Sequence, residues 1–126
     1  METYLVDTSL LIDHLRGKPQ ILDFLLQNRP SVSIVTLAEL IQGTKNKNQM
    51  RAVEDLLTDL PLIQINQSIS LKAITLMKKY FHSNHFEYLD ALIAGTAIEE
   101  NLSLITANIK HFQMLKELKL LSWPII

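Results

Sequence analysis

The sequence predicts an α/β fold, a three-layer sandwich in which a central, mainly parallel sheet of four to five strands is flanked by helices. Short apolar runs typical of buried strands alternate with segments whose apolar residues recur at helical spacing, and this alternation is the pattern of parallel sheets built from crossover units. The chain has 126 residues, of which 48% are hydrophobic and 20% charged, values typical of one globular domain. We therefore expect residues 1–126 to form a single domain.

The first part of the chain is predicted to contain two strands and four helices. The first apolar run ends at Asp7, and leucines at helical spacing follow it directly up to Gly17. A proline at position 30 ends the next helical segment, because the residue before a proline is disfavoured in a helix. The predicted elements are a strand at 4–6, helices at 9–15 and 20–28, a strand at 31–35, and helices at 36–43 and 50–57.

The second part of the chain repeats this alternation. Asn66 or Ser68 can cap a long helix, because both side chains accept hydrogen bonds from free backbone N–H groups. Asn108 is predicted to cap a short helix through Leu115 in the same way. The other predicted elements are a strand at 62–65, helices at 69–82 and 87–98, a strand at 102–106, and an edge strand at 119–122.

Asp90 is the unusual residue of this pattern, because it lies in a helical segment that is apolar on nearly every side. Such a helix is buried, and a buried carboxylate costs several kcal/mol, roughly, unless a cation meets it. No Lys or Arg occurs between Lys79 and Lys110. The charge is therefore met by a residue distant in sequence, neutralised by a raised pKa, or held for a metal ion. We favour the metal ion.

The carboxyl edge of the predicted sheet should gather several polar residues. Asp7 follows the first strand, Glu39 lies one turn into the helix after the second, and Thr106 and Asn108 follow the fourth. Ligand sites of open parallel sheets lie at this edge. Asp90 joins them if its helix passes the same edge. Three carboxylates without any cysteine favour a hard divalent cation, Mg²⁺ or Mn²⁺, and such an ion supports hydrolysis of phosphate esters.

Each of these residues also has a structural interpretation. Asp7 is suited to be a helix N-cap, and Glu39 is the fourth residue of the capping-box pattern that Thr36 begins. Hydroxyl groups and the Asn108 amide at strand ends commonly stabilise turns and caps. We expect these groups to support the carboxylates from the outer shell of the site; they belong to Thr8, Ser9, Thr106 and Asn108.

Contacts to a polyanion must be local, because the formal net charge is only −1. Three basic residues without an intervening acid follow the helix of Glu39, and they are candidates for RNA contacts: Lys45, Lys47 and Arg51. A solvated loop explains the same run equally well. The absence of cysteine and of a long apolar segment leads us to expect a cytoplasmic protein that does not enter a membrane.

The three acids and the polar residues expected to support them lie within four segments, 6–13, 33–40, 89–94 and 104–112. In this order and at this chain length, the segments resemble the motifs of the PIN-domain family, and more narrowly those of VapC-type toxins of bacterial toxin–antitoxin pairs. The resemblance implies a magnesium-dependent endoribonuclease that cleaves RNA by metal-activated water, forms a homodimer and is inhibited by a cognate antitoxin. It matches Asp7, Glu39 and Asp90 to the family's first three acidic positions, as catalytic residues and metal ligands.

The fourth motif departs from the family pattern. Many members have an acid there, whereas this chain has Asn108, followed three residues later by His111. With three carboxylates we expect one firmly held Mg²⁺ ion and a second that binds weakly or arrives with RNA. The missing acid also leaves open a different function, a catalytically weak or silent PIN-like module that acts by binding a protein.

Overall fold

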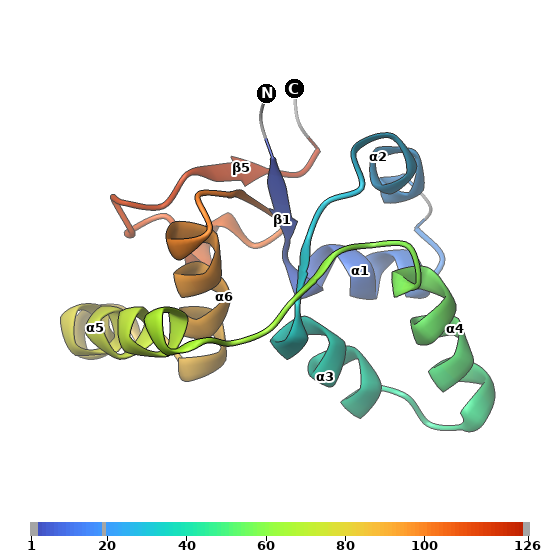
Figure 1. Cartoon of the computed structure of the whole chain (residues 1–126), viewed down its shortest axis with the longest axis horizontal. Coiled ribbons are helices and arrows are strands. Elements are labelled where there is room, and N and C mark those ends of the chain that lie inside the picture. Colours follow the sequence, from blue (N-terminus) through green and yellow to red (C-terminus); the bar gives the residue numbers. More distant parts are fainter. Residues whose placement is uncertain (1–2, 19, 125–126) are drawn as a thin grey trace.

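The computed structural model describes residues 3–18 and 20–124 of the chain. Three parallel strands form the main sheet in the order β1-β4-β5, with β1 at Tyr4–Val6, β4 at Ser103–Thr106 and β5 at Leu120–Ser122. A second parallel pair consists of β2 (Val32–Ser33) and β3 (Leu62–Ile63). Figure 1 shows β1 near the middle of the molecule with helices on either side.

The two sheets are joined edge to edge at β1. An isolated parallel bridge pairs Leu5 with Ser31, and the Val6 N–H donates to the Ser31 carbonyl oxygen over 3.1 Å. The strands therefore follow the order β3-β2-β1-β4-β5. Five parallel strands agree with the prediction, but the expected continuous sheet is interrupted because β2 and β3 each have only two residues.

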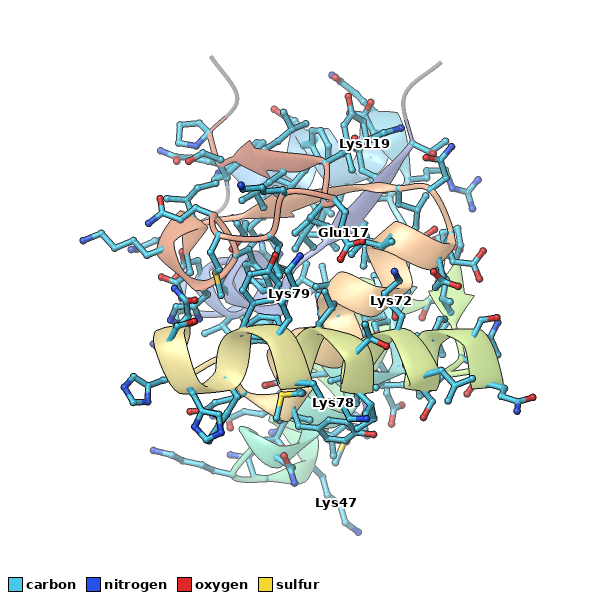
Figure 2. All side chains as sticks on the ribbon, turned by 90° about the vertical axis from the view of Figure 1, so that its left-hand side faces the viewer. Lys47, Lys72, Lys78, Lys79, Glu117 and Lys119 are labelled. Carbon is cyan, nitrogen blue, oxygen red and sulfur yellow. The ribbon has the colours of Figure 1, made fainter. Side chains whose placement is uncertain are left out.

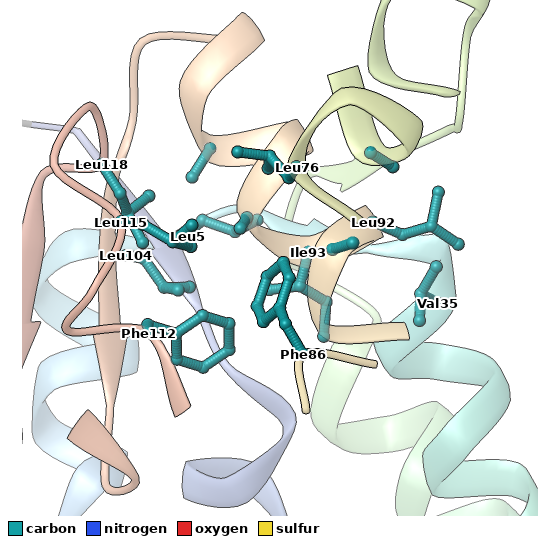
Figure 3. Close-up of a cluster of buried hydrophobic side chains, with 14 of the residues drawn as sticks. Leu5, Val35, Leu76, Phe86, Leu92, Ile93, Leu104, Phe112, Leu115 and Leu118 are labelled. Carbon is teal, nitrogen blue, oxygen red and sulfur yellow. The ribbon is translucent and has the colours of Figure 1, made fainter. Parts of the chain in front are cut away.

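Side chains alternate between the two faces of β1 and β4, because successive residues of a strand point to opposite sides. Leu5 and its partner Leu104 contribute to one buried cluster, whereas Val6 and Ile105 contribute to the other. Figure 3 shows Leu5 and Leu104 facing the helix that carries Ile93. Two apolar cores on opposite faces confirm the predicted three-layer architecture.

Helices α5 (Gln67–Asn84) and α6 (Tyr88–Glu99) cover the first face. They pack closely because α6 has Gly95 at the contact, where an added Cβ would lie 3.2 Å from the Ile69 carbonyl oxygen. Seven consecutive residues from Ala91 to Ala97 are buried, as the apolar pattern predicted. None of the helices in the described part of the chain is long and apolar enough to cross a membrane.

Four helices lie on or beside the second face: α1 (Thr8–Leu15), α2 (Ile21–Asn28), α3 (Ile34–Gln42) and α4 (Lys47–Leu57). The strand predicted at 31–35 is wrong in its second half, since α3 begins at Ile34. The short helix predicted after Asn108 is also wrong in extent. Only a 3-10 turn, η1 (Ile109–His111), forms there, followed by turns as far as β5.

Candidate active site

Asp7 lies directly after β1, at the carboxyl edge of the main sheet. Its side chain oxygen Oδ2 accepts hydrogen bonds from Ser9 Oγ and Thr106 Oγ1, each over 2.8 Å. Asp7 is only 6% exposed, and although it occupies the N-cap position of α1, its side chain makes no capping hydrogen bond. The capping interpretation of Asp7 is therefore wrong: its carboxylate is held by hydroxyl groups from α1 and β4.

Glu39 is held in a similar way from α1. Thr8 Oγ1 donates to Glu39 Oε1 over 2.8 Å, and the buried Thr36 Oγ1 lies 2.9 Å from Thr8 Oγ1. Because the single Thr8 proton goes to the carboxylate, Thr36 is the donor of the second hydrogen bond. Ser33 is the N-cap of α3, so the capping box expected for Thr36 and Glu39 does not form. Sequence reasoning missed that Thr36 supports this acid.

Asp90 lies in the first turn of α6, which begins at Tyr88, one residue after the start of the helix predicted at 87–98. Burial raises the pKa of Asp90 to about 6, the nearby His111 opposes this shift, and the negative charges of Asp7, Glu87 and Glu39 add to it. The carboxylate is therefore close enough to Asp7 and Glu39 to be repelled by both. These three acids lie at one edge of the sheet, from three different elements.

His111 is the partner of Asp90. Its Nδ1 atom lies 3.6 Å from Asp90 Oδ2, and the side chains are 55% and 29% exposed, respectively. Of the three explanations considered for Asp90, the distant partner is found in the structure. The pKa of Asp90 is also raised, but a pKa of about 6 does not neutralise the carboxylate at neutral pH. The search for Lys and Arg alone missed His111, although the departure in the fourth motif pointed to this position.

The fourth motif places Asn108 beside the same cluster. Its backbone N–H donates to Thr106 Oγ1 over 2.9 Å, so this hydroxyl accepts from Asn108 while it donates to Asp7. Asn108 is exposed, and its side chain makes no capping hydrogen bond to η1. The side-chain amide of Asn108 therefore makes no hydrogen bond to the turn that follows it.

The donor set has the chemistry of a divalent cation site, because it consists of carboxylate oxygens that repel one another without a counter-ion. Among residues 3–18 and 20–124, however, no group of three His, Cys, Asp or Glu side chains is close enough to hold a metal ion together. The charges of Asp7 and Glu39 each raise the pKa of Asp90, so these acids repel one another when no cation is bound. A cation removes the repulsion and allows the three groups to approach.

A cleft of about 410 Å³ extends from Glu39 between α1, α3 and α4. Apolar side chains of Ile12 and Leu15 contribute to its wall, and Arg16 and Lys45 bring positive charge to it. A second hollow of about 570 Å³ continues from Lys45 along the start of α4. The three basic residues proposed for RNA contact, Lys45, Lys47 and Arg51, all line this second hollow.

The family model of the PIN domain matches residues 4–117. This chain belongs to the PIN domain family. Ribonuclease VapC10 of Mycobacterium tuberculosis is 37% identical over 120 residues, which cover 91% of this chain and 90% of that protein. Ribonuclease VapC1 of Methanocaldococcus jannaschii is 34% identical over 116 residues, covering 90% of this chain and 81% of the relative.

Solved structures agree with this assignment. A toxin–antitoxin complex from Klebsiella pneumoniae contains a chain with 27% identity and a TM-score of 0.81, and the match covers 98% of this PIN domain and 100% of that chain. The DNA-bound VapBC of Salmonella typhimurium matches with a TM-score of 0.88 at 22% identity, over 98% and 99% of the two chains. The second likeness concerns the fold alone.

Proposed function

We propose that this chain is a divalent-metal-dependent endoribonuclease and the toxin of a toxin–antitoxin pair, with Mg²⁺ as its ion and Mn²⁺ as a substitute. The observation that carries the proposal is the convergence of Asp7, Glu39 and Asp90 at one sheet edge in a PIN domain. Relatives with 37% and 30% identity are named ribonucleases. In this proposal residues 1–126 act as a single domain in the cytoplasm, where its RNA is found.

Asp7, Glu39 and Asp90 are the groups that would hold the ion. A divalent ion bound there activates water and neutralises charge on the scissile phosphate. Asp7 and Glu39 are positioned for this role by hydrogen bonds from Ser9, Thr106 and Thr8. These hydroxyl groups fix the carboxylates before the ion arrives, which reduces the reorganisation that binding requires. Asn108, whose backbone N–H donates to Thr106 Oγ1, supports them from the outer shell of the site.

The two clefts give RNA a path to the acids. Phosphate groups are attracted by Lys45, Lys47 and Arg51 along the start of α4, and by Arg16 across the cleft that reaches Glu39. Such contacts are independent of base sequence and weaken with added salt. The proposal therefore expects cleavage to fall as ionic strength rises.

The partners in this proposal are a cognate antitoxin and a second copy of the chain. The antitoxin is supported by the solved neighbour from Klebsiella pneumoniae, which is a toxin–antitoxin complex. The homodimer is supported by apolar side chains on the outer face of α5, where Leu71 is 61% exposed and Ile74 and Phe81 are each 43% exposed. Figure 2 shows α5 lying across one whole face of the molecule. Sedimentation of the Ile74→Glu variant tests this surface, because an isolated charge disrupts an apolar interface.

The decisive experiment compares RNA cleavage by the wild type and by Asp90→Asn, with Mg²⁺ and with a chelator. We expect the variant to lose at least ~100-fold in rate, the scale on which one charge-stabilising group acts in an active site. Glu99→Gln is the matched control, since Glu99 is an exposed acid at the other end of α6. Full activity of Asp90→Asn would contradict the proposal, and so would cleavage that the chelator leaves unchanged.

A second function, a silent protein-binding module, is favoured by the absence of an acid in the fourth motif and by the exposed apolar face of α5. Titration with Mn²⁺ separates the two functions. Failure to bind Mn²⁺, both alone and with RNA, favours the module. Expression with and without the antitoxin adds a second test, because only a toxin slows growth in a way that its partner relieves.

A further inference from the structure

His111 places a nitrogen donor beside a site that otherwise consists of oxygen donors. We propose that His111 is a direct ligand, together with Asp90, of the divalent ion, and that it makes this site select Mn²⁺ over Mg²⁺. The inference rests on the proposed function, because it concerns the ion that Asp7, Glu39 and Asp90 are proposed to hold. It adds a ligand, and it replaces the preference for Mg²⁺ that the acidic residues alone imply with a preference for Mn²⁺.

The distance between the two side chains fits a shared ion. His111 Nδ1 lies 3.6 Å from Asp90 Oδ2, which is too long for a hydrogen bond. Two ligand atoms that each lie ~2.0–2.2 Å from one ion are separated by ~3–3.5 Å, depending on the coordination geometry. The pair therefore has to close by only a few tenths of an ångström, roughly, to bind one ion in common.

The backbone of His111 is fixed, whereas its ring is accessible. The His111 N–H donates to the Asn108 carbonyl oxygen over 3.1 Å, and the next residue, Phe112, is fully buried. Figure 3 shows Phe112 facing Phe86 in the core, and their ring centroids are 6.5 Å apart. The imidazole side chain is 55% exposed and lies beside Asp90. An ion that arrives from solvent can therefore bind to it without any change in the core.

The imidazole ring of His111 determines which ion the site binds more tightly. Mg²⁺ prefers oxygen ligands in a strict octahedron, whereas first-row transition-metal ions, including Mn²⁺, also accept imidazole nitrogen. A carboxylate at position 111 would supply the negative charge and the hard oxygen that Mg²⁺ requires. His111 supplies neither, so the site loses affinity for Mg²⁺ while it retains affinity for Mn²⁺.

Calorimetric titration of the wild-type protein with Mn²⁺ alone and with Mg²⁺ alone measures the preference. We expect tighter binding of Mn²⁺, a loss of ~10-fold or more of that affinity in His111→Ala, and a gain for Mg²⁺ in His111→Asp. His82→Ala is the matched control, because His82 is exposed on α5, and it should bind both ions as the wild type does.

Pulsed electron paramagnetic resonance of the bound Mn²⁺ provides a readout that is independent of activity. We expect nitrogen coupling in the wild type and in His82→Ala, and none in His111→Ala. If Mn²⁺ binds without nitrogen coupling, or if the coupling persists in His111→Ala, the inference on His111 is overturned while the proposed nuclease remains. Failure of both ions to bind, with and without RNA, overturns the proposed metal-dependent function itself.

Discussion

The acidic cluster consists of Asp7, Glu39 and Asp90, and its two sides, Asp7 with Glu39 and Asp90 alone, are held in different ways. Asp7 and Glu39 receive hydrogen bonds from hydroxyl groups, and the threonines behind them are buried at positions 8, 36 and 106. Asp90 receives no hydrogen bond from the described part of the chain, and it has only the longer contact with His111. The first side is organised by hydrogen bonds of the fold, whereas the second side has no such support among the described residues. Four changes test this difference.

The largest expected effect follows from Asp7→Ala. Removal of the carboxylate leaves the hydroxyls of Ser9 and Thr106 without their acceptor, so the free energy of unfolding should fall by about 2–3 kcal/mol. Urea unfolding at neutral pH without divalent ions measures this change. Asp55→Ala on the exposed side of α4 is the control and should stay within about 0.5 kcal/mol of the wild type. An Asp7→Ala protein as stable as the control would show that the hydroxyl groups do not depend on Asp7.

Asp90→Asn should raise the free energy of unfolding, whereas Asp7→Ala lowers it. The pKa of Asp90 is raised from 3.8 to about 6 in the folded protein, so the folded state binds more protons than the unfolded state between these values. The wild type therefore loses stability as pH rises through this range, because the charged form is disfavoured only when folded. Asn carries no charge, and we expect the variant to be more stable by about 2 kcal/mol above about pH 7.

The pH dependence is the control for this second change. Near about pH 4 the wild-type carboxyl is protonated in the folded state, so the advantage of Asp90→Asn should disappear there. Unfolding curves at both pH values, without divalent ions, measure the difference. If the variant is less stable than the wild type at neutral pH, Asp90 is held by the fold as firmly as Asp7, and the contrast between the two sides fails.

Thr106→Val should have an intermediate effect. The substitution keeps the shape of the buried side chain but removes the donor to Asp7 and the acceptor of the Asn108 N–H, for an expected loss of about 1–2 kcal/mol. Affinity for Mn²⁺ should also fall by ~10-fold, because the carboxylate is no longer oriented. Thr106→Ser retains the hydroxyl and should restore most of the affinity. If Thr106→Ser does not restore the affinity, the methyl group of Thr106 and not its hydroxyl determines the affinity for Mn²⁺.

Ser9→Ala should have the smallest effect. Ser9 Oγ also donates to Asp7 Oδ2 over 2.8 Å, but it is only partly buried, so water can replace it. We expect a loss of about 0.5 kcal/mol or less in unfolding free energy. A loss as large as that of Thr106→Val would mean that burial does not determine the strength of these hydrogen bonds.

Buried apolar runs allowed much of the fold to be predicted. β1 and β4 lie at the predicted places because their side chains are buried on both faces, which leaves a continuous apolar signal. The same signal failed at Ile34 and Val35, since β-branched residues also occur in buried helices and periodicity cannot separate the two in so short a run. The helix begins two residues earlier than predicted, so Ser33 is its N-cap and the capping box expected from Thr36 does not form.

The candidate site was predictable where it depends on chain order and not where it depends on contacts between distant segments. The closeness of Asp7 and Thr106 was predictable, because both residues lie at the carboxyl ends of strands that pair in the sheet. Thr36 and His111 act on Thr8 and Asp90, which are 28 and 21 positions away, respectively. No local pattern contains these pairs. The start of the helix of Asp90 was predicted to within one residue, since the helix expected at 87–98 begins at Tyr88.

The register of β1 against β4 has a consequence for how the protein can be monitored. Val6 pairs with Ile105, the Asp7 N–H donates to the Ile105 carbonyl oxygen over 2.9 Å, and the next residue on β4 supplies the Thr106 hydroxyl. A shift of one residue would turn Thr106 to the other face of the sheet and away from Asp7. Molecules that misalign these two short strands therefore lack an assembled acidic cluster. Under the proposed function, the fraction of chains that bind metal is a direct count of correctly aligned molecules.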